Sequence, residues 1–265
     1  MKRQRFAAGL LAALTLVGFA HVPAGAAAPV KKKGVAPLRV LVTNDDGVEG
    51  EGIDVLVEAL LNEPKLKITV VAPAENQSGA SDKTSPGPLV ATETTLLSGY
   101  EATAVQGFPA DSVLYALDEL GLKPHVVLSG INWGQNLGAG VPESGTIGAA
   151  RTAVRRGIPA LAISQGLGEP PDYATGADQA IKWLREHRKA LAKARGRGAT
   201  TAAEFNVPTC INGAVRGVLE DLPISTGRSA VGENDVHCDS TLTDPADDIE
   251  AFNNGFVTLN HVPAG

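Results

Sequence analysis

The chain has 265 residues, of which 43% are hydrophobic and 20% are charged, and this composition is typical of a globular protein and not of a disordered one. Its formal net charge of −6 argues against nucleic-acid polymers and anionic membrane surfaces as partners. A chain of this length can bury a sizeable core, either as one large domain or as two small ones.

The N-terminal segment has the order of features found in secretory signal peptides. A basic start over residues 2–5 precedes an apolar run over 6–20, and small residues with A-x-A spacing follow at 24–28. We therefore expect residues 1–28 to be cleaved and the protein to be secreted. Cleavage would change the net charge from −6 to −9, because three basic residues and no acidic residue are lost. The alternative is a cytosolic protein that keeps an apolar N-terminus.

The elements expected after this segment alternate between strands and helices. Residues 29–37 are rich in Lys, Gly and Pro, which is typical of a linker. Apolar runs predict strands over 38–42, 68–72, 102–105, 126–129 and 159–164. Helical spacing of apolar residues predicts helices over 53–61, 111–120, 144–156 and 178–193. This alternation predicts a mostly parallel sheet with helices on both faces, in a single α/β domain over 38–265.

Two regions fit this alternation poorly. Residues 73–98 contain many Ser, Thr, Gly and Pro residues, and we expect a long loop or a hairpin there. After about residue 200 the alternation weakens, and strands over 214–219 and 255–259 are expected in an irregular β extension.

Polar residues follow three of the predicted strands, where ordinary turns would not require them. The first strand leads to Asp45 and Asp46, the second to "PAENQSG" at 73–79, and a later one to Asn132 and Asn136. Because the carboxyl ends of parallel strands share one edge of a sheet, these side chains can meet in one crevice. Carboxylate, hydroxyl and amide oxygens suit Mg²⁺ or Mn²⁺. The alternative is a structural turn, since Asn-Asp-Asp-Gly is also a favourable turn sequence.

A second candidate element is the start of the helix at Ser144-Gly145-Thr146. Amides and hydroxyls at a helix N-terminus can bind a phosphate, although simple helix capping is the alternative. No Gly-Lys-Ser/Thr follows, so the segment is not a Walker loop, and no Gly-x-Ser-x-Gly elbow or zinc-spaced histidine pair is present.

The two cysteines of the chain are Cys210 and Cys238. An even number of cysteines in an exported protein predicts a disulfide bond. Two free buried thiols are the alternative.

Four motifs in this order resemble the SurE family of survival-protein 5′/3′-nucleotidases. They are "VLVTNDDG", "VVAPAENQSG", "VVLSGINWGQNLG" and "SGTIGAARTAVRRGIPALAIS", and the resemblance covers roughly residues 38–166. It implies a Rossmann-like fold and hydrolysis of nucleoside monophosphates or other small phosphate esters with one divalent cation. It also implies a homodimer or homotetramer.

The resemblance also implies roles for individual residues. The metal ligands, of which the first two are also the candidate catalytic residues, would be Asp45, Asp46, Ser78 and Asn132. The residues that would bind the phosphate or the rest of the substrate are Asn44, Gly79, Asn136, Ser144, Gly145 and Thr146.

One departure from the family pattern lies beside these residues. Glu143 replaces part of the more usual aromatic approach to Ser144, and it adds a negative charge near the expected pocket.

Two other functions are compatible with a pair of aspartates and a dication on such a sheet. These are a metal-dependent glycosyltransferase and a non-catalytic exported nucleotide-binding protein.

Overall fold

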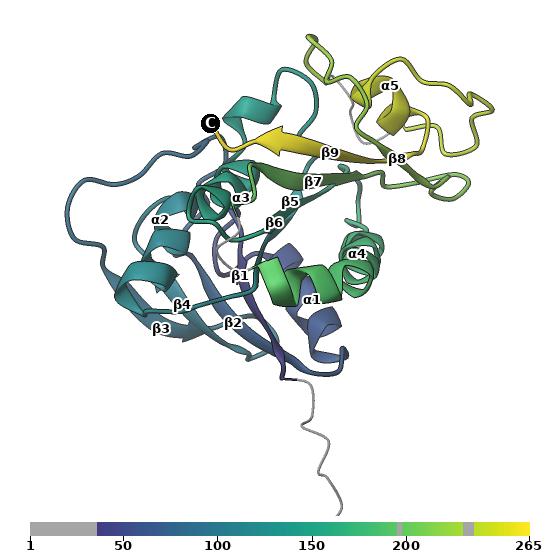
Figure 1. Ribbon diagram of the computed structural model, residues 1–265. Helices are drawn as coiled ribbons and strands as arrows, with labels where there is room; N and C mark the ends of the chain where they lie inside the picture. Colours follow the sequence, from purple (N-terminus) through teal and green to yellow (C-terminus); the bar gives the residue numbers. More distant parts are fainter. Residues whose placement is uncertain (1–35, 195–197, 230–235) are drawn as a thin grey trace, which may run out of the picture. The chain divides into compact units, whose positions relative to one another are not determined.

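The computed structural model describes residues 36–194, 198–229 and 236–265 (Figure 1). The expected signal peptide over 1–28 and nearly all of the expected linker lie outside these residues.

The described residues form one sheet of nine strands in the order β3-β4-β2-β1-β5-β6-β7-β9-β8. The strands are β1 (Leu38–Thr43), β2 (Leu66–Pro73), β3 (Ala91–Thr95), β4 (Glu101–Val105), β5 (Val126–Trp133), β6 (Ala160–Gln165), β7 (Thr201–Val207), β8 (Val218–Glu220) and β9 (Val257–Pro263). Neighbouring strands are parallel except for the β3–β4 and β7–β9 pairs. The expected mostly parallel α/β fold is therefore confirmed.

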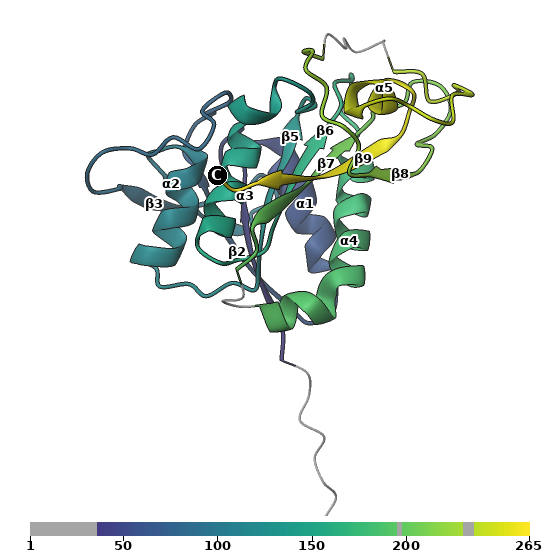
Figure 2. The ribbon, with the colours of Figure 1, turned by 45° about the horizontal axis from the view of Figure 1, so that its top comes forward.

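Helices cover both faces of the sheet (Figure 2). They are α1 (Glu51–Leu61), α2 (Pro109–Leu114), α3 (Gly145–Arg155), α4 (Tyr173–Ala194) and α5 (Asp248–Asn253), with a π-helical turn at Tyr115–Glu119 and a 3₁₀ turn at Val141–Glu143. No helix in the described part of the chain is long and apolar enough to cross a membrane.

The two faces of the sheet carry separate hydrophobic cores because side chains alternate along a strand. In β1, Val40 and Val42 belong to the core beneath α1 and α4. Leu41, between them, belongs to the core beneath α2 and α3. The apolar run Val40-Leu41-Val42 within β1 thus reflects a strand that is buried on both sides.

Three elements extend or divide differently from the sequence prediction. β5 continues to Trp133, so Asn132 lies within the strand and not beyond it, because pairing with β6 resumes at Asn132 and Ser164 after a register shift. The single helix expected over 111–120 is α2 followed by the π-helical turn. α4 begins at Tyr173, five residues before the predicted start.

The C-terminal region contains most of the elements that the sequence analysis missed. β7 and α5 were not predicted, β3 lies within the expected loop or hairpin, and the strand expected over 214–219 is only Val218–Glu220. β7 was overlooked because Glu204 and Asn206 interrupt its apolar pattern, yet both side chains are buried. The structure also joins Cys210 and Cys238 by a disulfide bond, with their Cα atoms 5.7 Å apart.

Candidate active site

Asp45 lies just after β1, against the N-terminus of α3. Its carboxylate is buried and its Oδ1 accepts a hydrogen bond from Thr146 Oγ1 at 2.6 Å. A Cβ atom at position 145 would lie 2.9 Å from the Asp45 Cβ, closer than such atoms approach in proteins. Gly145 therefore allows α3 to begin directly against the carboxylate.

Asp46 connects the ends of β2 and β5. Its Oδ2 accepts a hydrogen bond from the Trp133 amide at 3.1 Å, and its Oδ1 accepts one from Asn76 Nδ2 at 3.2 Å. Asn76 in turn accepts a hydrogen bond from the Ser78 amide at 2.9 Å. Because β1 is parallel to both β2 and β5, their carboxyl ends meet at Asp46, as the sequence predicted.

Burial disfavours the charged form of both carboxylates. It raises the pKa of Asp45 from 3.8 to about 6, although the hydrogen bond from Thr146 opposes the rise and the charge of Asp46 adds to it. Burial also raises the pKa of Asp46, against the hydrogen bonds from Trp133 and Asn76. A bound dication would reverse this effect by stabilising both carboxylates as anions.

The residues around the two aspartates fit a hard cation. Asp45, Ser78 and Asn132 line one pocket, and Asn132 Nδ2 donates to the Gly134 carbonyl at 2.6 Å, which leaves the amide oxygen as its possible metal ligand. The described segments contain no cluster of three or more His, Cys, Asp or Glu side chains that could hold a metal. The candidate donors are thus two carboxylates with neutral oxygens, a set that suits Mg²⁺ or Mn²⁺ better than zinc.

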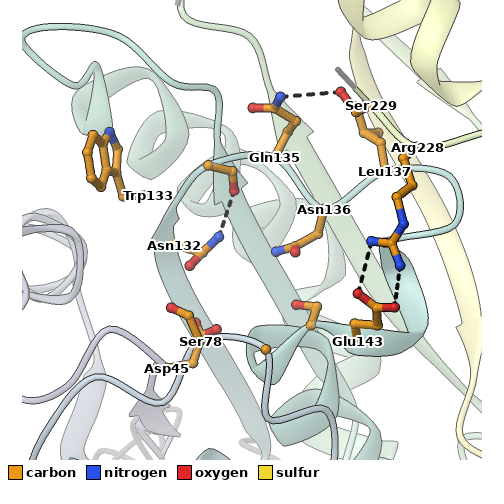
Figure 3. A pocket seen from close by; sticks show the side chains of 14 residues that line it. Asp45, Ser78, Asn132, Trp133, Gln135, Asn136, Leu137, Glu143, Arg228 and Ser229 are labelled. Atoms are coloured by element: carbon orange, nitrogen blue, oxygen red, sulfur yellow. Dashed lines mark hydrogen bonds and ion pairs between the residues drawn. The ribbon is translucent and has the colours of Figure 1, made fainter. Parts of the chain in front are cut away.

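The pocket has a volume of about 340 Å³ and lies between the strand ends and the start of α3 (Figure 3). This volume is at the small end of the range for ligand-binding pockets. Its lining consists of Asp45, Ser78, Gly79, Asn132, Trp133, Gly134, Gln135, Asn136, Leu137, Gly140, Glu143, Ser144, Arg228 and Ser229. The predicted residues Gly79, Asn136 and Ser144 thus line the same cavity as three of the candidate metal ligands. The fourth, Asp46, is not among the lining residues, and its carboxylate is held by Trp133 and Asn76.

Three of the predicted substrate-binding residues do not line the pocket. Asn44 is fully buried and donates to the Gly47 carbonyl at 2.7 Å, so it stabilises the turn that carries the aspartates. Thr146 is also buried, and its hydroxyl group holds Asp45. Gly145 provides the close approach described above. The side chains of Asn44 and Thr146 therefore support the turn and Asp45, while a phosphate contact of the backbone amides at the start of α3 stays a prediction.

Ser144 has two roles that the sequence analysis treated as alternatives. Its Oγ accepts a hydrogen bond from the Ile147 amide at 3.2 Å, which caps α3. The same residue lines the pocket. Capping and exposure to the pocket are therefore compatible at this position.

A buried polar network behind the pocket was not anticipated. The Asn206 side chain pairs with the backbone of Asn136, accepting from its amide at 2.6 Å and donating to its carbonyl at 3.1 Å. Asn206 also donates to Glu204 at 3.0 Å, and burial raises the pKa of Glu204 to about 8. Asn136 Nδ2 donates to Ser164 Oγ at 2.8 Å. The two polar residues within β7 were the sequence signal for this network.

Comparison with known proteins places the chain in a family. The family model described as "Survival protein SurE" matches residues 40–223. The 5′-nucleotidase SurE of Chlorobium limicola is 35% identical over 209 residues, which are 78% of this chain and 77% of that protein. The 5′-nucleotidase SurE of Methanopyrus kandleri is 44% identical over 129 residues, about half the length of each protein.

A solved structure agrees with these sequence matches. The SurE protein from Aquifex aeolicus superposes with a TM-score of 0.67 and 25% sequence identity, over 86% of this chain and 94% of that one. The resemblance seen in the sequence motifs is thereby confirmed, and the chain belongs to the SurE family.

Proposed function

We propose that this protein is a divalent-metal-dependent hydrolase of phosphate monoesters that acts on nucleoside monophosphates. The observation that carries the proposal is the meeting of Asp45, Ser78, Asn132 and Ser144 in one pocket. Relatives named 5′-nucleotidase SurE support the same activity.

The four candidate ligands, Asp45, Asp46, Ser78 and Asn132, would hold Mg²⁺ or Mn²⁺. Such an ion, when bound, polarises a phosphoryl oxygen and lowers the pKa of coordinated water.

The protein supplies the remaining chemistry. The hydroxyl group of Ser144 and the N-terminal end of α3 would bind the phosphoryl oxygens, because the helix dipole and its unpaired amides attract negative charge there. Asn136 would contribute a further polar contact, in a position fixed by Asn206. Asp45 Oδ2, which does not take part in the hydrogen bond with Thr146, would accept a proton from the attacking water, and the dication would keep this carboxylate ionised for that role.

The proposal includes export and self-association. The composition of residues 1–28 supports secretion, and the family resemblance supports a homodimer or homotetramer.

A substrate panel tests the proposal. Mature protein is incubated with nucleoside 5′- and 3′-monophosphates, with EDTA or with Mg²⁺, Mn²⁺ or Zn²⁺, and free phosphate is measured. Release that depends on a dication is the expected result. Transfer of a sugar without phosphate release would favour the glycosyltransferase alternative, and tight nucleotide binding without turnover would favour the non-catalytic one.

A further inference from the structure

Arg228 is the single basic residue among those that line the pocket within the described chain. Its guanidinium group forms a two-point ion pair with Glu143, with Nη1–Oε2 and Nη2–Oε1 distances of 3.0 and 2.5 Å. Figure 3 shows this pair on one side of the pocket and Asp45 with Ser78 on the other. The pocket therefore has candidate metal ligands on one side and the positively charged guanidinium group of Arg228 on the other.

The backbone that carries Arg228 is packed against the loop that lines the pocket. Gly138 has a φ of +55°, and a Cβ atom there would lie 2.3 Å from the Gly227 carbonyl oxygen, so only glycine allows this approach. The carboxylate of Asp248 accepts hydrogen bonds from the amides of Gly138 and Ser225, both at 2.8 Å. These contacts place Arg228 at the pocket wall in a defined position.

The ion pair itself is poorly suited to a structural role. The side chains of Arg228 and Glu143 are 64% and 57% exposed, and exposed ion pairs contribute little to stability. Glu143 directly precedes Ser144, the N-cap of α3. A phosphate group at this helix start would lie next to Glu143, would carry more negative charge, and would offer oxygens that match the guanidinium fork.

We propose that Arg228 is a further phosphate-binding residue, whose guanidinium group exchanges Glu143 for the oxygens of the phosphoryl group. This inference rests on the proposed function and adds a residue to its site. A phosphoryl group would then be neutralised on two sides, by the dication at the aspartates and by Arg228, as its charge is redistributed during transfer.

Isothermal titration calorimetry tests this assignment. The full mature protein is titrated with inorganic phosphate in the presence of Mg²⁺. We expect Arg228→Ala to weaken phosphate binding by roughly tenfold to hundredfold, the effect of losing hydrogen bonds between charged groups. Glu143→Gln should strengthen binding several-fold, because the competing carboxylate is lost. The double variant should lose that gain.

Arg185→Ala is the matched control. Arg185 also forms a two-point pair, with Glu63, at 3.1 and 2.5 Å, and its side chain is also 64% exposed, although the Glu63 side chain is only 8% exposed. Neither residue lines the pocket, so phosphate affinity should stay within twofold.

Two results would overturn the assignment. The first is a phosphate affinity of Arg228→Ala within twofold of that of the unmodified protein. The second is a loss of phosphate affinity in Glu143→Gln as large as the loss in Arg228→Ala, because the ion pair would then act only as part of the pocket wall. The titration needs no turnover. A protein that releases no phosphate from any ester would refute the proposed function, while the titration would still decide the role of Arg228.

Discussion

Replacing Asp45 by Asn should raise the stability of the metal-free protein and lower its catalytic activity, because the buried charge of Asp45 destabilises the fold but is needed for metal binding. The pKa of Asp45 rises from 3.8 to about 6 on folding, mainly because the group is buried. A shift of about two units corresponds to roughly 3 kcal/mol of lost stability for the ionised group. Asn keeps the acceptor for Thr146 and has no charge to bury, so the metal-free variant should be more stable at neutral pH.

The sign of the pH dependence follows from the direction of this shift. The folded state holds the proton of Asp45 more tightly than the unfolded state does. Near pH 3 both states are protonated and the difference between Asp45→Asn and the unmodified protein should be small. As the pH rises from about 4 to about 6, the unmodified protein loses stability, and the advantage of the variant should reach its full size above pH 6.

Catalysis should respond in the opposite direction. Without the Asp45 carboxylate, dication affinity should fall and nucleotide turnover should drop by about two orders of magnitude or more. The measurements are urea unfolding in EDTA at pH 3.5 and pH 8, dication titration, and phosphate release. Asp118→Asn is a control, because Asp118 pairs with Arg156 away from the pocket. Near-normal turnover in Asp45→Asn would refute the reasoning and leave the two aspartates as a turn.

Three further predictions concern other parts of the chain. Burial raises the pKa of Glu204 from 4.5 to about 8, so stability should decline as pH rises between these values, and Glu204→Gln should remove that decline in unfolding curves at pH 5 and pH 8. Non-reducing peptide mapping should find Cys210 linked to Cys238, and replacing both with Ser should lower the unfolding free energy by about 3–4 kcal/mol; two alkylatable thiols in the native protein would contradict this. Intact-mass measurement of protein from the culture medium should give a chain that begins near residues 27–29, and a retained Met1 would refute cleavage.

The amino-acid sequence was enough to predict the parallel part of the sheet, the helices α1 to α4 and the edge of the sheet where the candidate site lies. Apolar runs and helical spacing are local properties, so strands such as β1 and helices such as α3 were recognisable without knowledge of their neighbours. The parallel arrangement then required the strand ends that carry Asp45, Ser78 and Asn132 to share one edge. Secondary structure and the edge of the sheet were therefore enough to predict that Asp45, Ser78 and Asn132 lie in one pocket.

Only the tertiary structure decided what each of these residues contacts. Asn44 and Thr146 belong to the same motifs as the pocket residues, but packing turns their side chains toward the Gly47 carbonyl and Asp45. β7 was missed because its buried Glu204 and Asn206 are polar. The Asn206 side chain is held by the backbone of Asn136, 70 residues away, and no local pattern contains such a partner.

Arg228 shows the same limit over a longer distance. It is 85 residues from Glu143 in the sequence, and no periodicity or motif joins the two. They meet because Asp248 and the close approach of Gly138 to Gly227 hold the C-terminal region against the pocket loop. A local pattern of apolar and polar residues encodes helices and strands, whereas contacts between distant side chains arise only when the packed elements bring them together.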